Sequence, residues 1–176
     1  CRAVKCKDPA MLMKAVKNSA EIACTKHAHI RDGAAVARFI KWLKANVSTD
    51  EITEISAADY LWEERRRQGA YDLSFDTIAG YGPHGAIIHY EAAPETNAEL
   101  KPEGFLLVDS GGQYEDGTTD ITRTIALGPL TEKMKRCYTT VLKAHIALAT
   151  TEFDAETTGR ELDAIARKTL HAEGLD

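Results

Sequence analysis

Two aspartates interrupt segments whose other residues favour β-strands. Asp109 follows the apolar run Phe105 to Val108, and Asp120 lies in a Thr-rich segment, although Asp is a poor strand former. Such departures from local preference are expected at functional sites. Carboxylate oxygens are hard donors that suit ions such as Mn²⁺ or Mg²⁺. The pair therefore predicts a metal site, against an alternative in which both aspartates cap turns or pair with Arg123.

The distance between the two carboxylates depends on the hairpin that connects them. A turn centred at 114–115 would place Asp109 directly opposite Asp120, with Cβ atoms about 5 Å apart. A tight turn at 116–117 would instead stagger the pair by roughly 13 Å along the strands. A bulge at 111–112 would then have to bring the two carboxylates together. The sequence leaves both registers open.

A third candidate, His89, lies in the segment 86–90, which is rich in β-branched and aromatic residues and predicts a strand. Alone, such a histidine is more often structural than catalytic. The preceding residues 80–85 match G-x-G-x-x-G, but a dinucleotide site requires this loop to open a helix. Because Pro83 interrupts the loop and a strand is predicted after it, we interpret 80–85 as a glycine-rich turn between two strands.

The rest of the sequence supplies the elements that must position these residues. Apolar periodicity and capping residues predict helices over 8–45 (with Gly33 as a potential break), 53–68, 131–150 and 158–171. Strands are predicted over 71–78, 86–90, 105–109 and 118–127. The charged run 63–67 is interpreted as a solvated helix face. This order predicts an α+β domain, in which helices cover one face of a largely antiparallel sheet.

Composition argues against several classes of function. The 22 Lys and Arg against 27 Asp and Glu give a net charge of −5, so the broad basic surface of a nucleic-acid-binding protein is missing. We find neither an apolar run near the roughly 18 residues of a membrane span nor a signal peptide. Cys1, Cys6, Cys24 and Cys137 lack C-x-x-C spacing and are interpreted as reduced thiols. We therefore expect a cytoplasmic protein that binds neither nucleic acid nor membrane.

Three motifs follow one another along the chain. They are Ser74-Phe75-Asp76-Thr77-Ile78, Gly85-Ala86-Ile87-Ile88-His89-Tyr90, and the run from Asp109-Ser110-Gly111-Gly112-Gln113-Tyr114 through Asp116-Gly117-Thr118-Thr119-Asp120-Ile121-Thr122-Arg123-Thr124. In order and spacing they resemble the catalytic domain of aminopeptidase P, the Xaa-Pro aminopeptidase. Residues 17–21 and 28–33 resemble the first helix of the same domain, so the resemblance covers nearly the whole chain.

The resemblance implies the pita-bread fold and cleavage of the bond between an N-terminal residue and a following proline. That family usually holds two Mn²⁺ ions with two Asp, one His and two Glu. By motif match, Asp109 and Asp120 are the implied Asp ligands, and His89 the implied histidine that contacts substrate and assists proton transfer. Phe75 is implied as part of the pocket for the N-terminal side chain. The ions would acidify the attacking water.

The family motifs that carry the His ligand and both Glu ligands do not occur in this sequence. His171 is followed by Ala-Glu-Gly, which does not resemble the glycine- and histidine-rich motif of the family. We therefore expect residues 1–176 to be the N-terminal part of a metallopeptidase catalytic domain, an incomplete pita-bread fold that is inactive alone. The rest of the same enzyme could be present as a second chain, and the parent enzyme is expected to form a homodimer.

Two other functions stay open. Prolidase shares the fold and the ligands but cleaves Xaa-Pro dipeptides. Pita-bread domains also occur as non-catalytic binding modules that have lost metal ligands. Retention of Asp109, Asp120 and His89 argues against such a module, because a binding module has no need of the acidic pair.

Overall fold

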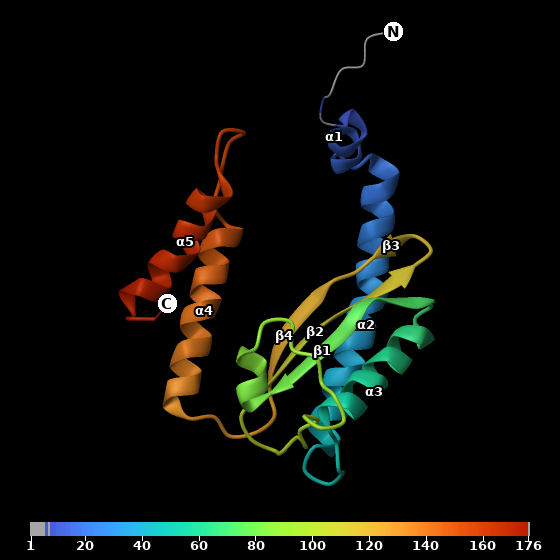
Figure 1. The fold of residues 1–176 in the computed structure, drawn as a ribbon, viewed down its shortest axis with the longest axis vertical. Helices are drawn as coiled ribbons and strands as arrows, with labels where there is room; N and C mark the ends of the chain where they lie inside the picture. Colours follow the sequence, from blue (N-terminus) through green and yellow to red (C-terminus); the bar gives the residue numbers. More distant parts are fainter. Residues whose placement is uncertain (1–5, 7, 176) are drawn as a thin grey trace. The chain divides into compact units, whose positions relative to one another are not determined.

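The computed structural model describes residue 6 and residues 8–175. The chain divides into two compact units, Cys1–Leu127 and Gly128–Asp176. Among the described residues, the first unit contains three α-helices and a sheet, and the second contains two α-helices (Figure 1). Cys6, Cys24 and Cys137 are free thiols, as predicted, while Cys1 lies outside the described residues. None of the helices within the described part of the chain is long and apolar enough to cross a bilayer.

The first predicted helix is in fact two, α1 (Pro9–Ala15) and α2 (Ser19–Asn46). The break is a capping box: the Asn18 side chain accepts from the Glu21 backbone N–H, and the Glu21 carboxylate accepts from the Asn18 N–H, both at 2.9 Å. Asn at this position therefore starts a new helix rather than continuing the old one. The suspected break at Gly33 was wrong, because α2 continues through it.

The sheet is antiparallel throughout, as predicted. Strand β2 (Phe105–Tyr114) is central, with β1 (Asp72–Tyr81) on one side and β3 (Gly117–Thr118) and β4 (Ile121–Ala126) along the other. Helix α3 (Glu54–Arg67) begins at the N-cap Thr53 and lies with α2 on one face of this sheet (Figure 1). The predicted strand over 118–127 is thus interrupted between β3 and β4.

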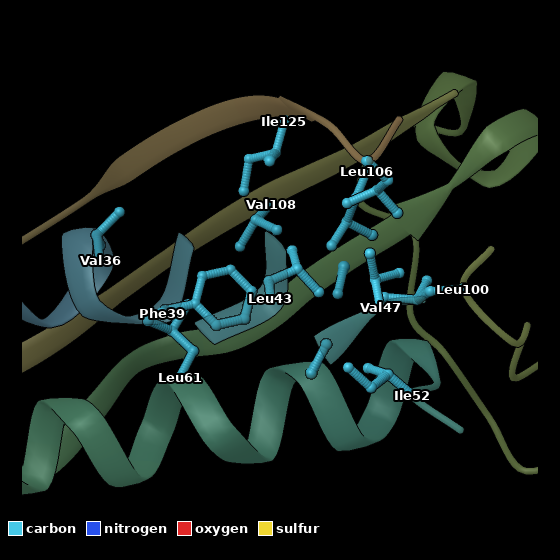
Figure 2. Packing of buried hydrophobic residues seen from close by; sticks show 13 residues of the cluster. Val36, Phe39, Leu43, Val47, Ile52, Leu61, Leu100, Leu106, Val108 and Ile125 are labelled. Carbon is cyan, nitrogen blue, oxygen red and sulfur yellow. The ribbon is translucent and has the colours of Figure 1, made fainter. Parts of the chain in front are cut away.

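The larger of two apolar clusters in the described part of the chain lies between the helices and the sheet, and the smaller consists of Ala28, Ala70 and Tyr114. Figure 2 shows the side chains of the larger cluster packed between α3 and the strands. Leu43, Leu61 and Leu106 are fully buried, and each such side chain contributes about 1.5–3 kcal/mol of hydrophobic stabilisation. The buried members of the cluster are Val36, Phe39, Leu43, Val47, Ile52, Ala57, Leu61, Ala79, Leu100, Leu106, Val108, Ile125 and Leu127.

The charged run 63–67 is only partly a solvated face, and in this respect the sequence interpretation was wrong. Arg65 is completely buried and forms a bidentate pair with the buried Asp32 of α2, at 2.7 and 3.0 Å. The Tyr114 hydroxyl donates to the same carboxylate at 2.9 Å. Burial and this bond to Asp32 raise the pKa of Tyr114. The Asp32 carboxylate can be buried because it accepts hydrogen bonds from Arg65 of α3 and Tyr114 of β2.

The segment 86–90 is not a strand, which corrects the prediction. A short 3₁₀ helix, η1 (Gly82–Ala86), follows β1, and the backbone then turns: Ile87 N–H donates to the His84 carbonyl at 3.0 Å and Tyr90 N–H to the Ile87 carbonyl at 3.2 Å. These local bonds replace a ladder with β1. The glycine-rich stretch 80–85 is therefore the end of β1 and most of the 3₁₀ helix, not a turn between two strands. The two parts pack so closely that a Cβ on Gly80 would lie 2.8 Å from the Gly85 nitrogen.

The second unit consists of α4 (Glu132–Ala149) and α5 (Gly159–Ala172), which pack on each other. Both begin at a threonine, as predicted. Thr131 accepts from the Met134 N–H at 3.2 Å, and Thr158 accepts from the Glu161 N–H at 3.3 Å.

Candidate active site

The first unit contains one cavity to which all the predicted site residues contribute. Its volume is about 390 Å³, and Phe75, His89, Asp109 and Asp120 all line it. The other lining residues are Asp76, Thr77, Ile78, Tyr90 and Glu91. Residues from β1, β2, the 82–104 connection and the β3–β4 junction thus converge on the same space. The sequence predicted these residues as one site, and the structure brings all four together.

Strand β2 directs Asp109 away from the core. Asp109 pairs with Ile78 of β1 and Thr122 of β4, whereas its neighbour Val108 pairs with Ala79 and belongs to the core. Successive side chains of a strand point to opposite faces, so Asp109 lies on the face opposite α2 and α3. The Thr122 hydroxyl donates to Asp109 Oδ1 at 2.8 Å. One carboxylate oxygen is thereby oriented, and the other has no hydrogen bond within the described residues.

The hairpin adopts neither of the two registers considered. Tyr114 pairs with Gly117, so the turn is 115–116, and Asp109 lies opposite Thr122 rather than Asp120. A regular ladder in this register would set the two aspartates diagonally on one face, about 7–8 Å apart. This spacing is intermediate between the two alternatives, and it needs no bulge at 111–112.

Contacts with α2 explain where the turn falls. The Asp116 carboxylate accepts from His27 Nδ1 at 2.6 Å and forms an ion pair with Arg31. The hydrogen bond from His27, aided by the Arg31 charge, lowers the pKa of Asp116. Together with the bond from Tyr114 to Asp32, these contacts fix the end of the hairpin on the helix. They join residues far apart in the sequence, so turn propensity alone could not predict the register.

Asp120 lies in the two-residue interruption between β3 and β4, next to Thr119. The carbonyl of Thr119, the preceding residue, accepts from the Ser74 hydroxyl of β1 at 2.9 Å, and the Thr119 N–H donates to the Gly112 carbonyl at 3.0 Å. Arg123 donates to the Thr122 carbonyl at 2.7 Å rather than to either aspartate. The alternative in which Asp109 and Asp120 pair with Arg123 is therefore wrong.

Irregularities in β1 bring Phe75 to the cavity. The pairing of β1 with β2 shifts twice, between Leu73 and Phe75 and between Phe75 and Ile78. In a regular strand, residues three apart point to opposite faces, but an extra residue in a bulge restores them to one face. Phe75 and Ile78 therefore both line the cavity. Nothing in the local sequence marks these shifts, since no glycine or proline lies within 72–79.

His89 reaches the cavity from an exposed turn. Its φ is +56°, and it is the one residue other than glycine with a positive φ in the described part of the chain. Most residues avoid this left-handed region, in which His is among those enriched several-fold. The local bonds of 84–90 and the anchoring of Tyr90 hold the turn. The prediction of His89 in a strand was wrong, yet its placement beside the aspartates agrees with the motif match.

Glu54, at the first position of α3, contacts the cavity-lining Tyr90 and was missed by sequence reasoning. It is fully buried, and its carboxylate accepts from Tyr81 N–H at 2.7 Å, His84 Nδ1 at 2.9 Å, the Tyr90 hydroxyl at 2.9 Å and Ala98 N–H at 3.0 Å. Burial opposes ionisation, but these hydrogen bonds outweigh it and lower the pKa of Glu54. In the sequence, an acidic residue in the first helical turn suggests only a dipole interaction.

The donor chemistry of the cavity fits a hard divalent cation in part. Asp109 and Asp120 offer carboxylate oxygens of the kind that Mn²⁺ and Mg²⁺ prefer. Within residue 6 and residues 8–175, no three His, Cys, Asp or Glu side chains are grouped so that they could hold a metal ion. Two carboxylates are too few for a closed metal site, so the described residues do not form one by themselves.

Comparisons with known proteins identify the family and the fold. The model of the metallopeptidase family M24 matches residues 23–176. Aminopeptidase P2 of Arabidopsis thaliana is 46% identical over 170 residues, which are 96% of this chain and 24% of that protein. The chain therefore spans about a quarter of the length of this curated relative.

Two solved structures extend the comparison. The X-prolyl aminopeptidase of Caenorhabditis elegans, described as a cytosolic enzyme with a di-nuclear active site, matches 96% of this chain and 28% of its own, with a TM-score of 0.90 and 37% identity. An Xaa-Pro dipeptidase from Bacillus anthracis matches 94% of this chain and 44% of its own, with a TM-score of 0.81 and 30% identity. The likeness confirms the predicted pita-bread fold over the part that this chain spans.

Proposed function

This chain belongs to metallopeptidase family M24, and from that premise we propose that it forms part of a metal-dependent aminopeptidase that releases the N-terminal residue from peptides with proline in second position. The observation that carries the proposal is the cavity lined by Phe75, His89, Asp109 and Asp120. The similarity to aminopeptidase P2 and to the X-prolyl aminopeptidase supports the same reaction.

In this proposal Asp109 and Asp120 are ligands of two divalent cations, most simply Mn²⁺. Both line the cavity and offer hard oxygen donors, which supports the assignment. The remaining ligands, one His and two Glu, come from parts of the enzyme outside residues 1–176, and both units of this chain belong to the N-terminal part of its catalytic domain. Bound ions would supply an acidified water as the nucleophile.

The other residues of the cavity act on the substrate. His89, exposed on its turn, donates a hydrogen bond to the peptide and assists proton transfer. Phe75 forms an apolar wall for the side chain of the N-terminal residue. The Thr122 hydroxyl holds Asp109 Oδ1 and so leaves the second oxygen of that carboxylate for a cation. The parent enzyme is proposed to be cytoplasmic and homodimeric, and light scattering on the purified protein would test the second of these statements.

The direct test is hydrolysis by the full-length protein that contains this chain. Metal-stripped protein is incubated with an Xaa-Pro-Xaa tripeptide and with an Xaa-Pro dipeptide, before and after addition of Mn²⁺. We expect Mn²⁺-dependent release of the N-terminal residue from the tripeptide. Absence of metal-dependent cleavage of either peptide would overturn the proposal.

The second candidate is prolidase activity. The similarity to the Xaa-Pro dipeptidase of Bacillus anthracis favours it, although the TM-score and the identity are both lower than for the X-prolyl aminopeptidase. Cleavage of the dipeptide but not of the tripeptide would establish this alternative in place of the aminopeptidase.

A further inference from the structure

We infer that Glu54 is a positioning residue, which holds the turn that carries His89 against the cavity although Glu54 itself does not line it. This inference rests on the proposed function for its catalytic consequence. The observation behind it is a completely buried carboxylate whose hydrogen bonds all come from the segment around His89 rather than from its own helix.

The carboxylate is saturated by its four donors. Oε1 accepts from Tyr81 N–H and His84 Nδ1, and Oε2 accepts from the Tyr90 hydroxyl and Ala98 N–H. An ionised carboxylate has about four acceptor positions, so none is left over. The four donors span 81–98, and thus both ends of the segment that contains His89 are tied to one residue.

Two of these donors bracket His89 directly. The His84 and Tyr90 rings stack with centroids 4.5 Å apart, and the turn between them is closed by the bonds from Ile87 to His84 and from Tyr90 to Ile87. His89 lies inside this bracket with its φ of +56°. A backbone in this region costs on the order of 1–3 kcal/mol and persists only where the surroundings enforce it. The Glu54 anchor is such an enforcing contact.

A glutamine cannot take the place of Glu54 in this arrangement. A glutamine of the same shape has one amide NH₂, which would face either Tyr81 N–H or Ala98 N–H. Both are backbone donors, which cannot be turned into acceptors. The substitution Glu54→Gln therefore creates a donor facing a donor at one end of the segment whichever way the amide is turned, while the volume of the side chain is kept.

The first experiment is a double-mutant cycle in the full-length protein loaded with Mn²⁺. It compares kcat on an Xaa-Pro-Xaa tripeptide, divided by bound metal, for wild type, Glu54→Gln, His89→Ala and the double variant. We expect Glu54→Gln to lower kcat on the order of 10²-fold, the loss caused by a misplacement of about 1 Å. The double variant is expected to be no slower than His89→Ala. Multiplicative losses would overturn the inference, because independent residues do not couple.

Two further variants separate positioning from a general loss of structure. Glu64→Gln makes the same chemical change in the same helix at an almost fully buried carboxylate, which pairs with Arg67 rather than with the His89 turn. It is expected to leave kcat per bound metal within about twofold of wild type. Tyr90→Phe removes a single donor to Glu54 and should lower kcat less than Glu54→Gln does, with the same coupling to His89→Ala. If Glu54→Gln does not fold, coupling in Tyr90→Phe decides the matter.

Hydrogen–deuterium exchange supplies a readout that does not depend on activity. In Glu54→Gln, or in Tyr90→Phe, backbone amides of 82–98 should exchange at least about tenfold faster than in wild type, while those of β2 keep their rates. Unchanged exchange in 82–98 would overturn the inference. If the wild-type protein cleaves neither peptide, the proposed function fails, and the exchange experiment still decides whether Glu54 holds the turn.

Discussion

The carbonyl oxygen of Thr119 lies 1.9 Å from the position that a Cβ atom on Gly111 would occupy, so the strand that carries Asp109 and the junction that carries Asp120 touch backbone to backbone. The Ser74 hydroxyl, which holds the same carbonyl, lies 2.2 Å from that position. No side chain at 111 fits without moving the junction. The contact makes glycine at this position a requirement of the site geometry.

Gly111→Ala is therefore expected to push Thr119 and Asp120 away from β2. We expect it to lower the free energy of unfolding by about 1–3 kcal/mol and to weaken metal binding. Urea denaturation and metal analysis after dialysis measure the two effects. Gly33→Ala is the matched control: a Cβ there meets nothing within 4 Å, and in a helix the change should stabilise by about 0.4–1 kcal/mol. Equal behaviour of the two variants would contradict the clash.

Replacement of Asp120 by Asn keeps the shape of the side chain and removes its charge. If Asp120 is a metal ligand, Asp120→Asn should lose most of the bound metal and lower kcat/KM at least about 10²-fold with the fold intact. Metal content is read by plasma mass spectrometry and the fold by circular dichroism. Asp76→Asn removes one charge from the same cavity at a residue outside the predicted ligand set. Equal metal loss in both variants would point to the overall charge of the cavity rather than to ligation.

The buried pair of Asp32 and Arg65 should respond differently to partial and complete removal. Asp32→Ala leaves Arg65 buried without a counter-charge and is expected to cost about 3–5 kcal/mol of the free energy of unfolding. The triple change Asp32→Leu, Arg65→Met and Tyr114→Phe removes every polar partner and should cost much less. Urea denaturation of both variants gives the comparison. A triple variant less stable than Asp32→Ala would show that the pair stabilises the fold on balance.

The stability of the first unit should depend on pH through Glu54. Its pKa is lowered in the folded chain, because four hydrogen bonds to the carboxylate outweigh the cost of burial. A group with a depressed folded pKa stabilises above its unfolded value, about 4.3 for Glu, and this stabilisation is lost as the pH falls through the folded pKa. The difference in urea midpoint between wild type and Glu54→Gln should be constant near neutral pH and shrink in acid. A difference that does not change with pH would contradict this linkage.

Much of the fold follows from local rules, and the failures have physical reasons. The caps Thr53, Thr131 and Thr158 mark helix starts correctly because a side-chain oxygen binds its own helix. The break at Asn18 was missed because apolar periodicity continues across it. Segment 86–90 has strand composition but pairs with no strand, and the N–H groups of Ile87 and Tyr90 form local hydrogen bonds instead. Burial of Arg65 depends on Asp32, a residue of another helix.

For the candidate site, too, the residues could be predicted from local sequence but their geometry could not. Residue types and motif order identified Asp109, Asp120, His89 and Phe75, all of which line the cavity. Their geometry depends on contacts between distant residues, such as the bond from Ser74 to Thr119. Neither the register of the hairpin nor the shifts in β1 could be read from local sequence, because both are set by such contacts.

The buried link between Asp32, Arg65 and Tyr114 also bears on how the first unit opens. It joins α2, α3 and β2. Detachment of any one of them leaves a charge or a hydroxyl of the other two without its hydrogen-bond partner in an apolar surrounding. Opening of one element alone is therefore costly. We expect the two helices and the central strand to behave as one cooperative unit, in which amide protons exchange only when all three open together. Asp109, in the middle of that strand, is then carried on the slowest-opening part of the unit.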